Sequence, residues 1–483
     1  MAYNRGGMMD ALPPDLRSIL TETPELSQAY LVGGCLRDWL LGLANTDYDI
    51  EVFGVGYEDL AKALGRWGKV DLVGRSFGVV KLTTGKGQTY DFSIPRRDSK
   101  TSPGHKGFEV AFDPALTPRE AAARRDFTIN SLMFDPREGK VLDFFGGEAD
   151  LRNRVLRHTS AAFPEDPLRV LRGMQFAARF ELTFAPETVE LSRNIKETYT
   201  ELARERVREE WFKWAEKSRK PSRGLEFLVA TEWVGNFPEL NAIRGVPQDP
   251  EWHPEGDVFV HTCHGCDAMA ELPEWKQSDT ERRVVYMLAV LTHDFGKATT
   301  TTEAEKRGKM RIVSPGHEDA SGDLAATFLE RINVPRAIRE RVVPLVVNHM
   351  AHFHTVSDRA VRRLSKRLEP ENIRGLITLM TADSFGRAPL PRRVPENIQA
   401  IATKAQELAV QEKPPSPILM GRHLLEHGFS AGPELGKVLN AAYEAQLAGR
   451  IRDLESGLDW LGRYPGLPES IRAAVRDSKS GRF

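Results

Sequence analysis

The sequence predicts an α/β domain near its beginning, followed by a long helical region. Between about residues 28 and 145, strand-like runs bounded by glycine or polar turns alternate with helix-like segments. From about residue 150 the pattern becomes helical and remains so. The chain has 483 residues, too many for one ordinary domain, so about three domains are expected.

The strand-like runs are AYLVGG, DYDIEVFG, KVDLVG, GVVKLTT and QTYDFSIP, and TPREAAARRDFTINSLMF predicts a helix that runs into a further strand. In the helical region, one helix is expected to begin near Asp166 with Pro167 in its first position, and another covers about residues 200–217. Residues 245–256, rich in Pro, Asp and Glu, indicate a linker.

Composition excludes several classes of protein. Hydrophobic residues make up 41% and charged residues 28%, which is typical of soluble globular proteins. The formal net charge is −1, so nucleic-acid binding would need local basic patches. We expect no signal peptide and no membrane span. The three cysteines (Cys35, Cys263 and Cys266) are too few for a disulfide framework, so a cytoplasmic location is expected.

The strongest functional signal is LVGGCLRDWLLGLANTDYDIEVFG, residues 31–54. It predicts a strand, a Gly33-Gly34 turn, a short helix and a second strand that carries Asp47 and Asp49. Because a strand has a period of two, both carboxylates are expected on one face. Paired carboxylates beside a glycine turn suit divalent metal and a nucleoside triphosphate. The alternative is a pair of solvent-facing acids on an edge strand.

The order LVGG-x-x-RD-x-LLG followed by DxD resembles the class II tRNA nucleotidyltransferases, which build the 3′ CCA end of tRNA, and their bacterial poly(A) polymerase relatives. The resemblance implies a head with a mixed five-stranded sheet and helices, followed by an all-α neck. It implies that Asp47 and Asp49 bind Mg²⁺, and that Gly33, Gly34 and Arg37 face the phosphates. Asp91, in TYDFS, is a candidate third catalytic carboxylate, with a structural role as the alternative.

A second motif, RRDFTIN at residues 124–130, is similar to a motif of the same family. The resemblance implies that Arg125 contacts the triphosphate, and that Asp126 and Asn130 hold the sugar end of the nucleotide. Arginine suits the first role because its planar donors grip phosphate oxygens in pairs. The loop-rich interval 95–118, with Gly104 and Gly107, resembles a loop that family members adding the terminal A keep in this region and that members adding only CC lack. The resemblance therefore favours addition of CCA or A over addition of CC alone.

A third motif, EDPLR at residues 165–169, matches the family motif that selects the incoming base. Asp166 and Arg169, three residues apart, are expected on one helix face, with Arg172 as a further candidate. A carboxylate accepts from the exocyclic amino group shared by C and A, and an arginine donates to the ring nitrogen that is a bare acceptor in those two bases. The alternative is an N-cap and a surface ion pair.

A second chemistry is indicated by His261, His293-Asp294 and Asp383, which resemble the ligands of metal-dependent HD phosphohydrolases. His317, His349 and Asp267 are additional candidates. Imidazoles and carboxylates suit Ni, Mn or Co better than Mg. Cys263 and Cys266 form a CxxC that we interpret as helix packing, since no second pair accompanies it.

The expected organisation is an N-terminal extension (1–27), a nucleotidyltransferase head (28–150), a helical neck that binds RNA and selects the base (151–245), an HD domain (246–395) and a helical tail (396–483). The expected activity is addition of C and A from CTP and ATP to the tRNA 3′ end, with a phosphohydrolase domain attached. The alternatives are an A-adding enzyme, a poly(A) polymerase, or an HD hydrolase of nucleotides or cyclic phosphates. The expected partners are tRNA, CTP and ATP, and the oligomeric state stays open.

Overall fold

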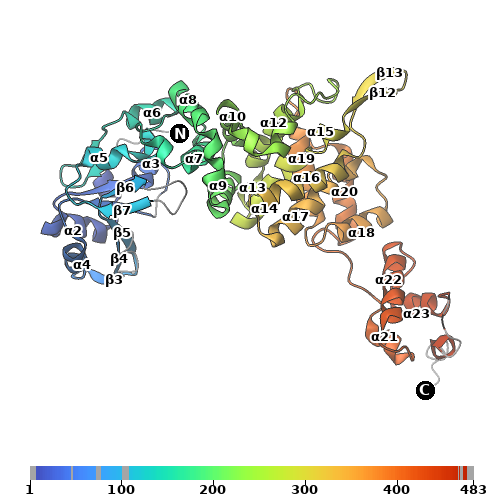
Figure 1. The fold of residues 1–483 in the computed structure, drawn as a ribbon. Coiled ribbons are helices and arrows are strands. Elements are labelled where there is room, and N and C mark those ends of the chain that lie inside the picture. The colour runs from blue at the N-terminus through green and yellow to red at the C-terminus, as the bar shows by residue number, and fades with distance from the viewer. Residues whose placement is uncertain are drawn as a thin grey trace. The chain divides into compact units, whose positions relative to one another are not determined.

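The computed structural model describes residues 7–44, 47–71, 78–100, 108–465, 467 and 471–475. The chain divides into two compact units, Met1–Phe237 and Pro238–Phe483. Figure 1 shows a sheet with flanking helices in the first unit and a mainly helical second unit. The prediction of an α/β head followed by a largely helical chain is therefore confirmed.

The head is built on one mixed sheet of seven strands in the order β3-β4-β5-β2-β1-β8-β9. The strands are β1 (Ala29–Val32), β2 (Asp49–Val52), β3 (Gly68–Asp71), β4 (Val79–Thr84), β5 (Thr89–Ser93), β8 (Met133–Asp135) and β9 (Lys140–Leu142). Only β2 and β5 pair in parallel; the other neighbours are antiparallel. The expected number of five was wrong because the sheet also contains β8, the further strand expected at the end of TPREAAARRDFTINSLMF, and β9, whose three residues are too few to show alternation.

Helices and a second hairpin complete the head. They are α1 (Met8–Ala11), α2 (Pro14–Glu22), α3 (Gly34–Leu40), α4 (Tyr57–Leu64), α5 (Pro118–Ala123), α6 (Gly147–Asn153) and the hairpin of β6 (Arg96–Lys100) and β7 (Phe108–Phe112). The interval expected to be loop-rich therefore contains two strands, and Gly104 and Gly107 lie outside the described residues. Asp15 of α2 accepts hydrogen bonds from Tyr90 (2.8 Å) and Thr84 (3.0 Å), which ties this helix to the sheet.

The neck consists of helices packed around α7 (Leu168–Phe180). Its other elements are β10 (Val155–Leu156), β11 (Thr183–Phe184), α8 (Pro186–Asn194), α9 (Arg204–Lys217) and α10 (Pro221–Ala230). Helix α7 packs against both α9 and α10. Gly224 allows the close approach of α10, because a Cβ there would lie 2.6 Å from the Met174 carbonyl oxygen. The neck is not all-α as expected, since β10 and β11 pair in parallel.

The second unit contains the helices α11 (Pro238–Ala242), α12 (Val258–Glu271), α13 (Pro273–Lys276), α14 (Thr280–Thr292), α15 (Lys297–Thr300), α16 (His317–Arg331), α17 (Arg336–Val347), α18 (Asp358–Arg367), α19 (Ile373–Phe385), α20 (Glu396–Glu407), α21 (Gly421–Glu426), α22 (Pro433–Leu447) and α23 (Leu454–Gly462). One hairpin, β12 (Thr302–Lys306) with β13 (Lys309–Val313), projects from these helices (Figure 1). Its turn places Arg307 and Gly308 at φ 53° and 76°, which suits a tight hairpin connection. No helix in the described part of the chain has the length and apolar character to cross a bilayer.

Candidate active sites

A cluster of carboxylates lies where β2 begins. Asp49 is the first residue of β2, opposite Val32 on β1 and opposite Asp91 on β5. Asp47 lies two residues before the first residue of β2, so the prediction that both aspartates belong to this strand was wrong. Partial burial and then the negative charge of Asp47 raise the pKa of Asp49, and Asp91 adds to this effect. Such mutual repulsion is relieved by a bound cation.

Glu51 is a further carboxylate of this cluster that the sequence analysis missed. Its charge also raises the pKa of Asp49, and its Oε2 lies 3.0 Å from Arg125 Nη2. The available signal was the alternation D-x-D-x-E, which continues the period of two by one further residue. Gly33, at φ 72°, lets Arg125 approach the turn, because a Cβ there would lie 3.1 Å from Arg125 Nη1. Asp91 lies 3.5 Å from Lys81 Nζ.

The RRDFTIN segment forms a buried network rather than a free surface. Asp126 accepts hydrogen bonds from Asn130 Nδ2 (2.9 Å) and from Arg172 Nε (2.7 Å). Burial opposes the charge, but Arg172 and Asn130 hold the pKa of Asp126 below its usual value. Arg37, 4% exposed, donates to Asn130 Oδ1 (2.6 Å) and to Asp38 (2.8 Å). The network thus connects α3 of the head with α7 of the neck.

The two residues expected to select the base are held by different partners. Helix α7 begins at Leu168, and Asp166 precedes it with extended backbone angles. The prediction that Asp166 and Arg169 share one helix face was therefore wrong. Asp166 instead pairs with Arg206 of α9, with Nη2 2.8 Å from Oδ2. Arg169 donates to the carbonyl oxygens of Ala162 and Arg124, both at 2.6 Å. Both side chains are therefore fixed in place, with hydrogen-bonding capacity to spare.

One pocket of about 470 Å³ in the first unit brings the head and neck residues together. All nine residues predicted to bind nucleotide line it, and so does Asp49, whereas Asp47 and Asp91 do not. The remaining lining residues are Gln175, Phe176, Arg179, Arg206, Lys213 and Lys217; of these, Arg206 lies in the segment 205–210, which also resembles a motif of the family. Cationic side chains outnumber carboxylates in this lining, which suits a triphosphate.

This head and pocket define a nucleotidyltransferase, a class of enzyme whose catalysis depends on a divalent metal ion. Residues 29–157 match the family model described as the poly A polymerase head domain. A multifunctional CCA protein of Xanthomonas campestris pv. campestris is 34% identical over 432 residues, covering 87% of this chain and 98% of the relative. The multifunctional CCA protein of Pasteurella multocida is 34% identical over 377 residues, covering 74% and 84%. The chain therefore belongs to the CCA-adding enzyme family of class II, as the motifs indicated.

Solved structures share the fold. A CCA-adding enzyme in an apo form matches with a TM-score of 0.63 and 19% identity, covering 95% of this chain and 99% of that one. The Thermotoga maritima CCA-adding enzyme complexed with tRNA matches with a TM-score of 0.57 and 18% identity, covering 99% and 100%.

In the second unit, the predicted histidine and aspartate ligands are buried together. His261 Nε2 lies 3.1 Å from Asp383 Oδ1, and His293 Nε2 lies 3.3 Å from Asp294 Oδ2. His261 Nδ1 is hydrogen-bonded to Glu255 (2.7 Å), a partner that fixes which ring nitrogen faces the cluster. Burial would raise the pKa of Asp294, but the positive charges near it hold that pKa well below its usual range.

Two cations and two further histidines adjoin this cluster. Lys297 Nζ lies 2.7 Å from Asp294, and Arg387 lies 3.2 Å from Asp383. His317 and His349 form a group with Asp294. Among the described residues, neither Asp267 nor a cysteine belongs to any group with metal-ligand spacing, and Cys263 and Cys266 are buried on α12. A cavity of about 530 Å³ reaches Asp294, Lys297, His317 and Arg387.

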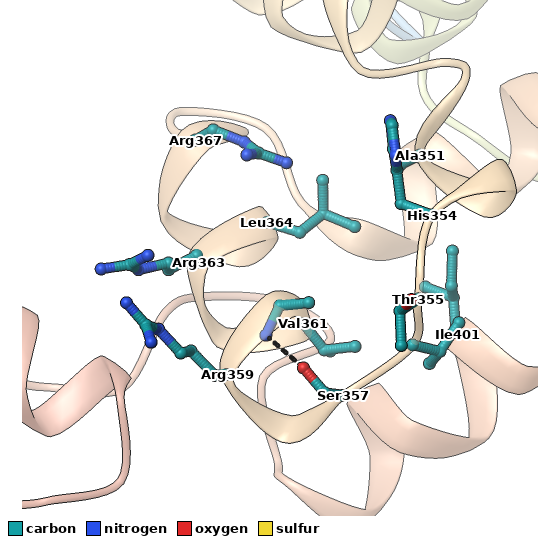
Figure 2. Close-up of a pocket in the computed structure, with 12 residues that line it drawn as sticks. Ala351, His354, Thr355, Ser357, Arg359, Val361, Arg363, Leu364, Arg367 and Ile401 are labelled. Atoms are coloured by element: carbon teal, nitrogen blue, oxygen red, sulfur yellow. Dashed lines mark hydrogen bonds between the residues drawn. The ribbon is translucent and has the colours of Figure 1, made fainter.

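Helix α18 carries a row of three arginines. Figure 2 shows Arg359, Arg363 and Arg367, spaced four residues apart, along one pocket of the second unit. Arg363 pairs with Glu444 at 2.5 Å. Within the part of the chain that the structure describes, Arg359 and Arg367 have no ion pair. These two guanidinium groups are therefore available to a phosphate backbone.

Proposed function

We propose that this protein adds C and A from CTP and ATP to the tRNA 3′ end without a nucleic-acid template. The observation that carries the proposal is the convergence of Asp49, Arg125, Asp166 and Arg169 in one pocket of the first unit. Membership of the CCA-adding family and the printed names of the relatives support the same substrate. In the reaction, the tRNA 3′ hydroxyl attacks the α-phosphate of the nucleotide and pyrophosphate leaves.

Asp47, Asp49 and Asp91 would hold Mg²⁺, since clustered carboxylate oxygens are the ligands that this ion prefers. The bound ion would lower the pKa of the attacking hydroxyl and neutralise charge on the leaving pyrophosphate. Arg125 would bind the triphosphate from beside Gly33, where the absence of a Cβ leaves room for both. Arg37 bonds to Asn130 and Arg172 bonds to Asp126, and these two pairs would hold the side of the pocket that contacts the sugar and phosphates of the nucleotide.

Asp166 and Arg169 would read the base. Arg206 orients the Asp166 carboxylate, and two backbone carbonyls orient Arg169, so both groups meet the base preorganised. The carboxylate accepts from the amino group of C or A, and the guanidinium donates to the neighbouring ring nitrogen. The carbonyl and protonated ring nitrogen of U and G would leave both groups unsatisfied, which disfavours those bases.

The direct test uses purified protein with Mg²⁺, CTP and ATP and three tRNAs, ending at the discriminator base, at C and at CC. Sequencing of the 3′ ends should find CCA on all three. Addition of A only to the CC-ended tRNA would identify an A-adding enzyme, and long A tails a poly(A) polymerase. Absence of extension on every substrate would contradict the proposal.

We also propose that residues 246–395 form an HD phosphohydrolase domain with a transition-metal ion (Ni, Mn or Co) bound by His261, His293, Asp294 and Asp383. The Nε2 atoms of His261 and His293 face carboxylate oxygens at 3.1 Å and 3.3 Å, and Nδ1 of each ring is held by another acceptor, so Nε2 of each neutral ring can bind a metal. Lys297 and Arg387 would bind the phosphate of a nucleotide or of a 2′,3′-cyclic phosphate. Hydrolysis of 2′,3′-cAMP that requires Ni²⁺, Mn²⁺ or Co²⁺ and disappears in Asp294→Asn would support this; a purely Mg²⁺-dependent hydrolysis would contradict it.

A further inference from the structure

Two exposed aromatic side chains lie on the rim of the cavity in the second unit. Among the Phe, Tyr and Trp side chains that the structure describes, only Phe112, Trp252 and Phe353 are exposed, and the last two line the same cavity of about 530 Å³. Trp252 is 56% exposed and Phe353 is 60% exposed. Because large apolar surfaces are unfavourable in water, two such rings on one cavity indicate a site for the apolar or aromatic part of a ligand.

The floor of this cavity has the opposite character. Asp294 and Lys297 line it and are only 1% and 9% exposed, whereas both rings are more than half exposed. The cavity therefore passes from an exposed aromatic rim to a buried floor that carries charge. Lys297 and Arg387 are the cations that the proposed hydrolase uses to bind a phosphate. A ligand that fills the cavity thus combines a phosphate with a planar, apolar group.

The backbone that carries each ring is held in place by hydrogen bonds. Trp252 N–H donates to the Asp249 carbonyl oxygen (3.1 Å), and the Asp249 side chain pairs with Arg311 of β13 (3.2 Å). Phe353 N–H donates to the Met350 carbonyl oxygen (3.0 Å) in a short 3₁₀ turn. Rings on an ordered backbone give up little conformational freedom when a ligand stacks on them.

Two uncharged polar side chains of the lining are already bonded to other protein groups. Gln248 accepts a hydrogen bond from Lys297 Nζ (2.9 Å) and donates to the Gly256 carbonyl oxygen (3.2 Å). The hydroxyls of Ser314 and Thr301 are hydrogen-bonded to each other at 2.8 Å. Stacking does not need such groups, because every base has an aromatic face. We therefore expect ring contact, rather than readout of base edges, to hold the ligand.

We propose that Trp252 and Phe353 bind the base of a nucleoside monophosphate or nucleoside cyclic phosphate by stacking, while its phosphate lies beside Lys297 and Arg387. The inference rests on the proposed hydrolase function and adds to it the residues that favour nucleotides over phosphate esters without a base. Stacking on one aromatic side chain strengthens binding about 5- to 140-fold. All four bases are accepted, since each can stack.

The test compares two substrates of the full-length protein in Ni²⁺: adenosine 2′,3′-cyclic phosphate, and glycerol 1,2-cyclic phosphate, which has no base. Trp252→Leu keeps apolar bulk but removes the ring. It should lower kcat/KM for the adenosine substrate about 5- to 140-fold, through KM, and leave the glycerol substrate unchanged. Phe353→Leu should act in the same direction, whereas Trp252→Phe should retain most of the activity because a ring remains.

Met310→Ala, which changes an exposed side chain of the same unit outside the cavity lining, is the matched control and should alter neither substrate. Equal losses on both substrates in Trp252→Leu would overturn the proposal, since Trp252 would then support the cavity rather than the base. A strong preference for one base that persists in Trp252→Leu would also overturn it, because stacking would not be the source of recognition.

A binding measurement separates this inference from the hydrolase function. Equilibrium dialysis of adenosine 3′-monophosphate needs no hydrolysis, and it uses full-length protein carrying Arg125→Ala and Asp166→Ala, so that these two residues of the head do not contribute to binding. Binding that Trp252→Leu weakens, in a chain that hydrolyses neither cyclic phosphate, would contradict the hydrolase but support the base site. Binding that Trp252→Leu and Phe353→Leu both leave unchanged would overturn the base site, whatever the chain hydrolyses.

Discussion

Replacing Asp166 with alanine tests base selection most directly. In the structure its carboxylate is paired with Arg206 through Nη2 at 2.8 Å and Nη1 at 3.4 Å, and it lines the same pocket as Asp49 and Arg125. If it accepts a hydrogen bond from the amino group of C or A, that charge-assisted bond contributes about 1.5–3 kcal/mol. The corresponding preference over U and G is roughly 12- to 140-fold, since each 1.4 kcal/mol is a factor of ten.

The assay measures kcat/KM for CTP, ATP, UTP and GTP on tRNAs that await C or A. In Asp166→Ala we expect the ratio of correct to incorrect nucleotide to fall by about this factor, chiefly through slower use of CTP and ATP. Glu165→Ala, the neighbouring exposed carboxylate outside the pocket lining, is the matched control and should keep the ratio. Arg206→Met should lower the ratio in the same direction, because the carboxylate loses the partner that orients it.

An equal loss of kcat/KM for all four nucleotides, with the ratio unchanged, would refute the argument. It would mean that Asp166 serves only to attach the start of α7 to α9 through its ion pair. A melting temperature that falls in Asp166→Ala but not in Glu165→Ala would accompany that result.

Three other predictions follow from the structure. Asp49→Asn should lower the rate of nucleotide addition by more than about 100-fold, because mutating even a residue that only hydrogen-bonds to a metal ligand lowers metal affinity or activity about 10–100-fold. Binding of tRNA, measured in a filter assay, should be unchanged in this variant. Gly147→Ala should lower the free energy of unfolding of the first unit by about 1–3 kcal/mol in urea, because the new Cβ would lie 2.2 Å from a backbone oxygen. The control is Gly235→Ala, whose Cβ would meet open space, so its free energy of unfolding should not change. Removing both Arg359 and Arg367 should weaken tRNA binding and reduce the slope of log affinity against log salt by about two; an unchanged slope would exclude phosphate contacts there.

The local patterns in the sequence were informative wherever function depends on a short stretch of chain. The Gly33-Gly34 turn, the DxD spacing and the adjacent His293-Asp294 are each complete within a few residues. They predicted the family, which is confirmed, and the motifs of the head and neck named most of the residues that line the pocket of the first unit. The sequence patterns failed for β9, because a three-residue strand shows too little alternation to be recognised.

Only the tertiary structure shows which residues distant in sequence contact each other. Arg206 reaches Asp166 across 40 positions, and Arg37 reaches Asn130 across 93. A sequence pattern repeats with the period of a helix or strand and so reports which face a residue occupies, but not what lies opposite that face. Here the sequence by itself determined which chemical groups are present and in what order. The packing of α7 against α9, and the packing of the helices around Asp294, decided which of these groups contact each other. Local periodicity cannot predict such contacts, because they depend on distances in space between segments far apart in the sequence.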